Sequence, residues 1–587
     1  MSAFTTSITR DGMRIYKNPN SVDIPQVDLP TLLFDTEHSL AEDDTPLHLS
    51  AANPNIFLTK KTLRALAERI SYFLRHSFSV GANGPYKDVV VVCSSGQPAA
   101  PAAFYGIIGA GGVFSAASPS FTPEELARQI KQGKSKTLIV SEDKIEVGKK
   151  AAKIAGLSLE RVIVLNSEPE FEVRRLDGGK RVDVQNGPRL QWRKVTDPEE
   201  LKRSLIVLLY SSGTTGVPKG QYSWHLRVNP KLNFPGVMLS HANMVAQVFI
   251  PSVQARAHVA AAVQAGEPAP QPYRTLAHLP IAHIAGVHGY LIAPMFSGGA
   301  VYWMPKFTWQ PFLESIKRLK ITAFYTVPSI FLRIAKSSDV TDQFATVETA
   351  ITGAAPMDAE LQQAANSKLG NGNTRISQTW GLSETTGAVT AMPRGASDVT
   401  GAISPVLPNM EMRIVDDDFK DVAPGQPGEI IVRGPFVTNG YFDNEEATKA
   451  TFHNGWFCTG DIAVERSGKF YVVDRKKELL KYKGLQIAPA ELENHLITHP
   501  DILEAAVVGM PIEGGSEVPR AYVVPRKMGA LSEEEVKHFV KKHFADYKQL
   551  RGGVRFVDEL PKNAVGKILR RELRDRAKAE EGVKAKL

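Results

Sequence analysis

Cysteine is scarce in this chain, with only Cys93 and Cys458 among 587 residues. The two lie far apart, and neither belongs to a cluster with metal-ligand spacing. The sequence therefore argues against a disulfide scaffold and against a cysteine-rich metal site. A reducing compartment is the default expectation for such a chain.

Long apolar runs are also missing. The most apolar stretches, such as residues 102–114, are too short and too rich in glycine to span a bilayer. Residues 1–16 lack the apolar run of a secretory signal. We therefore expect no transmembrane segment.

Concentrated charge is the third feature that the sequence lacks. The formal net charge is +8, and the basic residues are scattered apart from local concentrations at 475–483 and 562–578. There is no basic stripe with interleaved aromatic residues and no recognisable nucleic-acid-binding module, which argues against a nucleic-acid partner. A solvated surface that tolerates small anionic ligands is the better interpretation.

The hydrophobic pattern is typical of an α/β protein. Apolar runs rich in Val and Ile alternate with amphipathic stretches, as in βαβ units with a largely parallel sheet. Residues 87–93, 136–140 and 205–210 are predicted strands, and residues 101–111 a packed helix. From residue 428 the pattern (GEIIVRG, then GKFYVVDR) favours antiparallel β-structure.

A boundary is expected at about Asp474. We predict a large domain over residues 1–473, containing parallel sheets and a β-rich subdomain. After it we predict a small α+β domain over residues 474–587, with a helix from Pro489 and a strand at 505–509. We refer to residues 474–587 as the lid.

A loop rich in Ser, Thr and Gly follows the strand at 205–210 and reads YSSGTTGVPKG. Its hydroxyls can donate hydrogen bonds, its glycines let backbone N–H groups approach a ligand, and Lys219 adds a point charge. These types suit a polyphosphate, although the spacing of a Walker A loop is absent. Composition alone leaves a solvated turn as the alternative. The candidate phosphate-binding residues are Ser211, Ser212, Gly213, Thr214, Thr215, Gly216 and Lys219.

This loop resembles the phosphate-loop signature of the acyl-CoA synthetase, peptide-synthetase adenylation and luciferase superfamily. Six further motifs follow in that family's order, and their amino-acid sequences are most similar to those of the 4-coumarate–CoA ligase-like branch. They are LPIAHIAG (279–286), GAAP (353–356), QTWGLSE (378–384), GWFCTGD (455–461), DRKKELLKYKGLQIAPA (474–490) and LPKNAVGKIL (560–569). The resemblance implies an adenylate-forming enzyme fold with a mobile C-terminal lid.

The resemblance also implies a nucleotide site. In it, Asp461 and Arg475 would bind the ribose, Glu384 would hold Mg²⁺ on ATP, and Ser383 would keep the hydroxyl of the family's usual threonine. The residues expected around the adenine and phosphates are Gly353, Ala354, Ala355, Pro356, Gln378, Thr379, Trp380 and Gly381. Trp380 stands where the family has tyrosine, so stacking is kept while the phenolic OH is lost.

Two sets of catalytic residues follow from the resemblance, one for each half-reaction. Lys567 would bridge the acyl carboxylate and the phosphate oxygens, and His283 would gate the acyl pocket. Rotation of the lid about Asp474 would then exchange Lys567 for a loop that carries Lys481, Gly484 and Gln486 and accepts coenzyme A. Read alone, His283 would be a satisfied core histidine, and Lys567 and Glu384 would be surface residues.

One departure separates this chain from the resemblance. Relatives run from PKG directly into VMLSH, whereas here residues 221–236 intervene, and removing those 16 residues restores PKGVMLSH. We interpret them as a retained intron, because glycine codons at both ends allow an in-frame splice. A genuine surface loop is the alternative. Such an insertion could displace Lys219 and weaken activity.

The chain ends Ala585-Lys586-Leu587, a near match to the Ser-Lys-Leu peroxisomal address. This ending predicts binding of a peroxisomal import receptor, and the cytoplasm is the alternative location.

We predict an AMP-forming acid–CoA ligase that uses ATP, Mg²⁺ and coenzyme A with an aryl, hydroxycinnamic or medium-chain fatty acid. The alternatives are adenylation for another acceptor, such as a carrier protein or a luciferase-like oxidation, and a nucleotide-binding pseudoenzyme disabled by the insertion.

Overall fold

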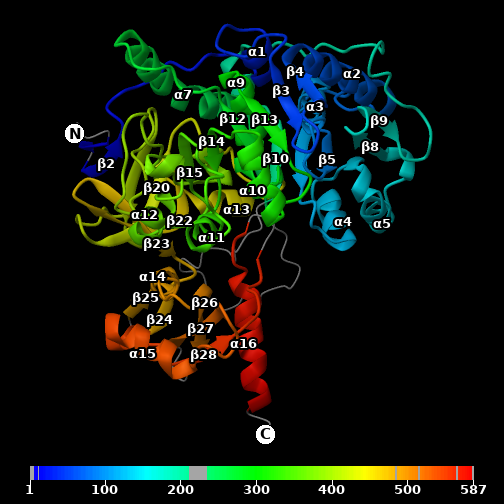
Figure 1. Cartoon of the computed structure of the whole chain (residues 1–587). Helices are drawn as coiled ribbons and strands as arrows, with labels where there is room; N and C mark the ends of the chain where they lie inside the picture. The colour runs from blue at the N-terminus through cyan, green and yellow to red at the C-terminus, as the bar shows by residue number, and fades with distance from the viewer. Residues whose placement is uncertain are drawn as a thin grey trace.

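The computed structural model describes residues 5–10, 12–210, 235–482, 485–512, 516–562 and 566–584. Figure 1 shows a large body built by the chain up to about residue 475, with the lid on one side of it and helix α16 extending away toward the C-terminus. Within the described residues, no helix combines the length and the hydrophobicity needed to cross a bilayer. The mixed α/β class predicted from the pattern is confirmed.

The first sheet of the large body has the strand order β11-β10-β6-β5-β7-β8-β9. Its strands β10, β6, β5, β7 and β8 are parallel, and its two edge strands are antiparallel. The bounds are β5 Val89–Cys93, β6 Val113–Ala117, β7 Thr137–Ser141, β8 Val162–Asn166, β9 Glu172–Arg175, β10 Val207–Tyr210 and β11 Gly236–Leu239. The predicted strands at 87–93, 136–140 and 205–210 are therefore confirmed.

Helices cover both faces of this sheet, which explains why its central strand β5 is buried at every position. Along β5, Val90 and Val92 join one hydrophobic cluster, whereas Val91 and Cys93 join another on the opposite face. Helices α2 and α3 pack in the first cluster and α4 and α5 in the second. The bounds are α2 Lys60–Phe78, α3 Ala100–Gly109, α4 Pro123–Gln132, α5 Ile145–Ala155, α6 Pro198–Arg203 and α7 His241–Gln264.

A second layer of sheets carries the loops of the candidate site. One sheet has the order β12-β13-β3-β4, and a parallel three-stranded sheet has the order β14-β15-β16. The strands are β3 Pro46–Ser50, β4 Phe57–Thr59, β12 Arg274–Ala277, β13 Ala300–Trp303, β14 Ala323–Tyr325, β15 Thr349–Thr352, β16 Ile376–Gln378, and the hairpin β17 Gly381–Leu382 with β18 Gly387–Ala388. The helices are α1 Leu29–Phe34, α8 Ile284–Gly286, α9 Ala293–Ser297, α10 Trp309–Arg318, α11 Pro328–Lys336 and α12 Ala359–Asn366.

The predicted β-rich subdomain is an antiparallel sheet with the order β1-β2-β19-β20-β22-β21, and β23 pairs with β22. Its bounds are β1 Thr6–Arg10, β2 Met13–Lys17, β19 Glu411–Val415, β20 Pro427–Arg433, α13 Glu445–Thr451, β21 Phe452–His453, β22 Trp456–Arg466 and β23 Lys469–Arg475. Asp474, the predicted boundary, is the penultimate residue of β23.

The lid has its own α+β architecture and its own apolar clusters. A two-stranded hairpin (β24 Leu480–Tyr482, β25 Leu485–Ile487) precedes the three-stranded sheet β26 Ile502–Pro511, β27 Glu517–Pro525 and β28 Val554–Phe556. The helices are α14 Pro489–Leu496, α15 Glu533–His543 and α16 Arg570–Lys584. The helix predicted from Pro489 and the strand at 505–509 are both present.

Candidate functional site

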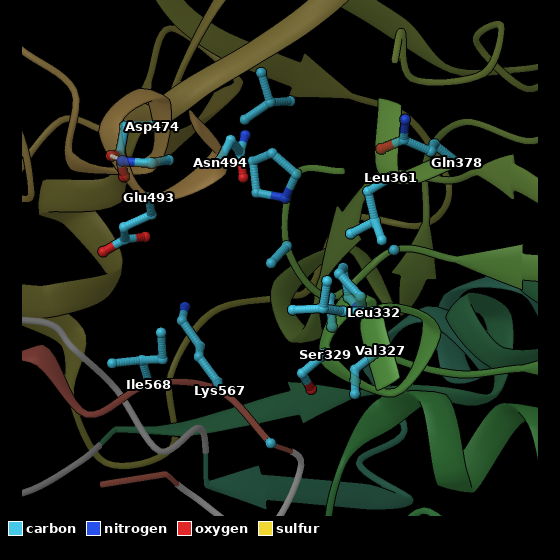
Figure 2. A pocket seen from close by; sticks show the side chains of 18 of the residues that line it. Val327, Ser329, Leu332, Leu361, Gln378, Asp474, Glu493, Asn494, Lys567 and Ile568 are labelled. Atoms are coloured by element: carbon cyan, nitrogen blue, oxygen red, sulfur yellow. Dashed lines mark hydrogen bonds between the residues drawn. The ribbon is translucent and has the colours of Figure 1, made fainter. Parts of the chain in front are cut away.

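A cleft of about 1560 Å³, including its open mouth, lies between the large body and the lid. Figure 2 shows side chains from both parts facing it, with Lys567 and Glu493 on the lid side and Ser329, Leu332 and Gln378 on the other. Most of the predicted nucleotide residues line this cleft although they lie far apart in the sequence. They are Gly353, Ala354, Ala355, Pro356, Gln378, Thr379, Trp380, Gly381, Asp461, Arg475 and Lys567.

The predicted adenine loop, residues 353–356, leaves the end of β15 and is held by its neighbours. The side-chain amide of Gln378 donates to the carbonyl of Met357 (2.7 Å) and accepts from its N–H (3.1 Å). A Cβ at position 353 would lie 2.5 Å from Thr379 Cγ2, so only glycine fits there without a shift. Gln378 therefore fixes the loop, a role that its motif does not reveal.

Trp380, Asp461 and Arg475 form a hydrogen-bonded unit. Asp461 on β22 lies opposite Arg475 on β23, and the guanidinium Nε is 3.1 Å from one carboxylate oxygen. The indole Nε1–H of Trp380 donates to the other oxygen at 2.9 Å. The carboxylate is 5 % exposed, so these two donors orient it within the cleft. The indole thus supplies a polar contact where a loss of hydrogen bonding was expected.

Replacing Trp380 by Phe is expected to raise the KM for ATP about tenfold with a smaller change in kcat. An aromatic ring is kept at this position, but one oxygen of the buried Asp461 carboxylate loses its hydrogen-bond donor. An unsatisfied buried acceptor of this kind costs about 1–3 kcal/mol. Trp380→Tyr, which restores a hydroxyl donor, serves as the matched variant and should recover part of the loss. Initial rates at saturating acid and CoA measure the effect. An unchanged KM in the Phe variant would contradict this role of the indole.

Ser383 and Glu384 lie on the turn η5 (Ser383–Thr385) between β17 and β18, outside the set of residues that lines the cleft. Glu384 is 9 % exposed, and one of its carboxylate oxygens accepts a hydrogen bond from Tyr441 Oη at 3.0 Å. In the described parts of the chain, no three His, Cys, Asp or Glu side chains are arranged to hold a metal ion. One buried carboxylate suits Mg²⁺ that arrives with ATP, because Mg²⁺ keeps phosphate oxygens and waters as its other ligands.

Lys567 and His283 are electrostatically coupled across the interface. Burial and the nearby guanidinium of Arg475 together lower the pKa of Lys567 to about 8, while the carboxylate of Asp461 opposes that shift. Burial together with the charge of Lys567 lowers the pKa of His283 to about 4, so this imidazole is neutral at pH 7. His283 caps α8, and its Nδ1 accepts the N–H of Ala285 at 3.2 Å, so Nε2 carries the proton.

Lys481 and Gln486 lie away from the cleft. They are directly opposite each other in the β24–β25 hairpin, and both are exposed. The backbone N–H of Lys481 donates to Glu517 of β27 at 3.2 Å, which joins the hairpin to the lid sheet. Gly484 lies outside the described residues, as do the predicted phosphate-binding residues Ser211, Ser212, Gly213, Thr214, Thr215, Gly216 and Lys219.

Two charged residues of the interface, Arg570 and Glu493, were not predicted from the sequence. They pair within the lid, at 3.1 Å for the Nε of Arg570, and no local sequence signal identifies them because they lie 77 positions apart. Asp474 was predicted as the hinge, and its carboxylate accepts the N–H of Ala490 at 3.0 Å and so satisfies a free donor in the first turn of α14. All of these residues line the cleft.

Comparison with known proteins agrees with this geometry. The model of the AMP-binding enzyme family matches residues 42–228 and 229–442, and that of the AMP-binding enzyme C-terminal domain matches 491–567. A putative acyl-coenzyme A synthetase of Emericella nidulans is 44% identical over 97% of this chain and all of its own length. Phenylacetyl-CoA ligase epaB of Aspergillus niger is 31% identical (96% and 99% covered), and 4-coumarate–CoA ligase 1 of Arabidopsis thaliana 36% (85% and 84%).

A solved structure is similar as well. ATP-bound MatB from Rhodopseudomonas palustris superposes with a TM-score of 0.75 at 26% identity, covering 94% of this chain and 98% of that one. The match therefore includes both the large body and the lid. This chain belongs to the AMP-binding enzyme family of acyl-CoA synthetases.

Proposed function

We propose that this protein is an AMP-forming acid–CoA ligase that activates a carboxylic acid with ATP and transfers the acyl group to coenzyme A. The observation that carries the proposal is the cleft itself. It brings Trp380 and Asp461 of the large body together with Arg475, beside the hinge, and Lys567 of the lid. Relatives that align over the same length are named acyl-CoA synthetases and CoA ligases, which supports this activity.

In the first half-reaction, an oxygen of the acid forms a bond to the α-phosphorus of ATP. The bond from that phosphorus to the oxygen bridging the β-phosphate breaks, and pyrophosphate leaves. An anion approaches an anion here, so catalysis consists mainly of charge neutralisation and alignment. We assign the neutralisation of charge between the acid and the phosphate to Lys567 and the orientation of the ribose to Asp461 and Arg475. Glu384 would hold Mg²⁺, which would neutralise charge on the triphosphate.

In the second half-reaction, the sulfur of coenzyme A bonds to the acyl carbon, the thiol proton goes to solvent, and AMP leaves. Lys481 and Gln486 are exposed on the lid and distant from the cleft, so we propose that the lid (474–587) rotates about Asp474 to bring their hairpin inward. A carrier-protein thiol is the alternative acceptor. The charged, exposed hairpin favours a soluble phosphorylated thiol such as coenzyme A.

The acid would lie beside His283, and the neighbouring side chains favour an aryl acid. Gly286 and Gly289 allow close packing here, because a Cβ would lie 2.3 Å from the carbonyl of Pro280 and 2.2 Å from the hydroxyl of Tyr325. The ring of Tyr325 lies beside that of Tyr290, with centroids 4.9 Å apart, and Tyr290 is buried. Tyr325 is partly exposed, and a flat aromatic acid would stack on its ring. Medium-chain fatty acids are the second class that we propose.

The proposed location in the cell rests on the sequence alone. Residues 585–587, Ala-Lys-Leu, lie outside the described residues, and we propose them as a peroxisomal import signal.

A pseudoenzyme is the alternative to the ligase. The presence of Lys567, Asp461 and Arg475 in one cleft, together with the retention of Glu384 on η5, favours an active enzyme, since an inactive relative has no need of all four.

The direct test is acid-, ATP- and CoA-dependent release of AMP by the purified protein, with fatty, arylacetic and hydroxycinnamic acids assayed side by side. We expect AMP and acyl-CoA to appear in equal amounts with at least one acid, and arylacetic or hydroxycinnamic acids to give the highest kcat/KM. AMP release that needs the acid but not CoA would indicate another acceptor. ATP binding without AMP release with any acid would support the pseudoenzyme.

A further inference from the structure

Lys336 crosses the interface between the large body and the lid. It is the last residue of α11, and its ammonium donates to the backbone carbonyls of Ile497 and Ile502 at 2.6 Å each and of His499 at 3.4 Å. Ile497 is the C-cap residue of α14, and Ile502 begins β26. All three N–H groups of this half-buried lysine are therefore directed to the lid backbone.

The end of a helix is a favourable place for such a cation. The last carbonyls of α14 lack partners within the helix and carry the negative end of its dipole. At the other end of α14, the carboxylate of Asp474 on β23 accepts the N–H of Ala490 at 3.0 Å. Side chains therefore contact helix α14 at both ends, Asp474 of the hinge at its start and Lys336 of the large body at its end, each with the charge that its end of the dipole prefers.

Apolar packing supports the same contact. Ile497 of the lid packs against the hydrophobic cluster of the large body to which Ile330 and Ala335 of α11 also contribute. The charged neighbours of Lys336 are Arg526, which lowers its pKa together with burial, and Glu360, which opposes that shift. The lysine hydrogen bonds reach only carbonyls, so the contact depends on the position of the lid backbone and not on a movable acidic side chain.

We propose that Lys336 is a positioning residue that holds the lid in the orientation that places Lys567 in the cleft. This inference rests on the proposed function, in which the lid uses one orientation for acyl-AMP formation and another for thioester formation. Rotation about Asp474 must break the contacts of Lys336, because they join the large body to a helix of the rotating part. Lys336 therefore favours the first half-reaction selectively, although it touches no reacting atom.

The test separates the two half-reactions. In Lys336→Met we expect the acid-dependent exchange of pyrophosphate into ATP to fall about tenfold, which corresponds to about 1.4 kcal/mol. Thioester formation from synthetic acyl-AMP and CoA should stay the same or become faster. Lys336→Arg, which keeps the charge and several donors, should recover most of the exchange activity. Lys317→Met removes a surface ion pair with Asp342 within the large body and should change neither half-reaction.

A second measurement does not depend on catalysis. Hydrogen–deuterium exchange over residues 495–503 should rise in Lys336→Met and not in Lys317→Met, because loss of the contact frees this end of α14 from the large body. Equal losses in both half-reactions would reveal a merely structural role and overturn the proposal, as would unchanged pyrophosphate exchange or unchanged deuterium uptake. If the wild-type protein lacks ligase activity with every acid, the proposed function fails, and deuterium uptake still decides whether Lys336 docks the lid.

Discussion

Replacing Lys567 by alanine is expected to lower the rate of acyl-AMP formation about 10²–10³-fold, the usual cost of removing a group that stabilises charge in a transition state. The lysine is recessed in the cleft, near Arg475 and Asp461, where water screens charge poorly. Its loss leaves the approach of the carboxylate to the phosphate without the charge of this ammonium group. Pyrophosphate exchange measures this step directly.

The same variant should form thioester from synthetic acyl-AMP and CoA at close to the wild-type rate, since the proposed rotation of the lid would take Lys567 out of the cleft in that step. Lys548→Ala is the matched control, because Lys548 is another lid lysine and pairs with Glu491 on the surface at 2.5 Å. We expect it to change neither rate more than about twofold, as for an exposed ion pair. An equal loss of rate in both half-reactions of Lys567→Ala would contradict the proposal that rotation of the lid replaces Lys567 by the hairpin of Lys481 and Gln486.

Deletion of residues 221–236 is expected to raise ligase activity about 10²-fold or more over the full-length chain, because displacement of a catalytic loop by even 1 Å can cost that much. The fold should survive. Strands β10 and β11 pair antiparallel with Tyr210 opposite Gly236, so the loop joins adjacent strand ends and can close at either length. In the shortened chain, Gly220 takes the place of Gly236. The two forms are compared by AMP release with the same acids.

The match to the family model divides within this segment, between residues 228 and 229, as an insertion relative to the family would make it do. A full-length protein as active as the shortened one would assign the segment to the working enzyme as a genuine surface loop. Sequencing of the transcript gives an independent answer. If most reads contain these codons, the intron hypothesis is wrong.

Much of the fold could be predicted because its signals are local. The valine run at 89–92 identifies a strand that is buried on both faces, and the two short apolar segments that follow residue 428 in close succession mark the antiparallel sheet. The site could be located for a different reason. Its residues occur in short motifs whose order matches a known family, and the structure brings most of the predicted nucleotide residues into one cleft.

The parts that could not be predicted depend on contacts between distant segments. The hydrogen bond from Trp380 to Asp461 joins residues 81 positions apart, and that from Lys336 to Ile497 joins residues 161 apart. Neither side chain has a local pattern that specifies its partner. The amide of Gln378 illustrates the limit most clearly. Its motif predicts contact with the nucleotide, whereas its hydrogen bonds are made to the loop beneath.

The register of the β24–β25 hairpin has a consequence for the energetic cost of changing half-reactions. Lys481 and Gln486 are directly opposite each other, and opposed residues of an antiparallel pair share one face. The hydrogen bond from Lys481 to Glu517 ties that face to the lid sheet. The backbone of the hairpin therefore already places the two residues side by side, before the rotation that we propose would bring them to the cleft. A single rotation would deliver both together, without the entropic penalty of ordering a loop around the second substrate.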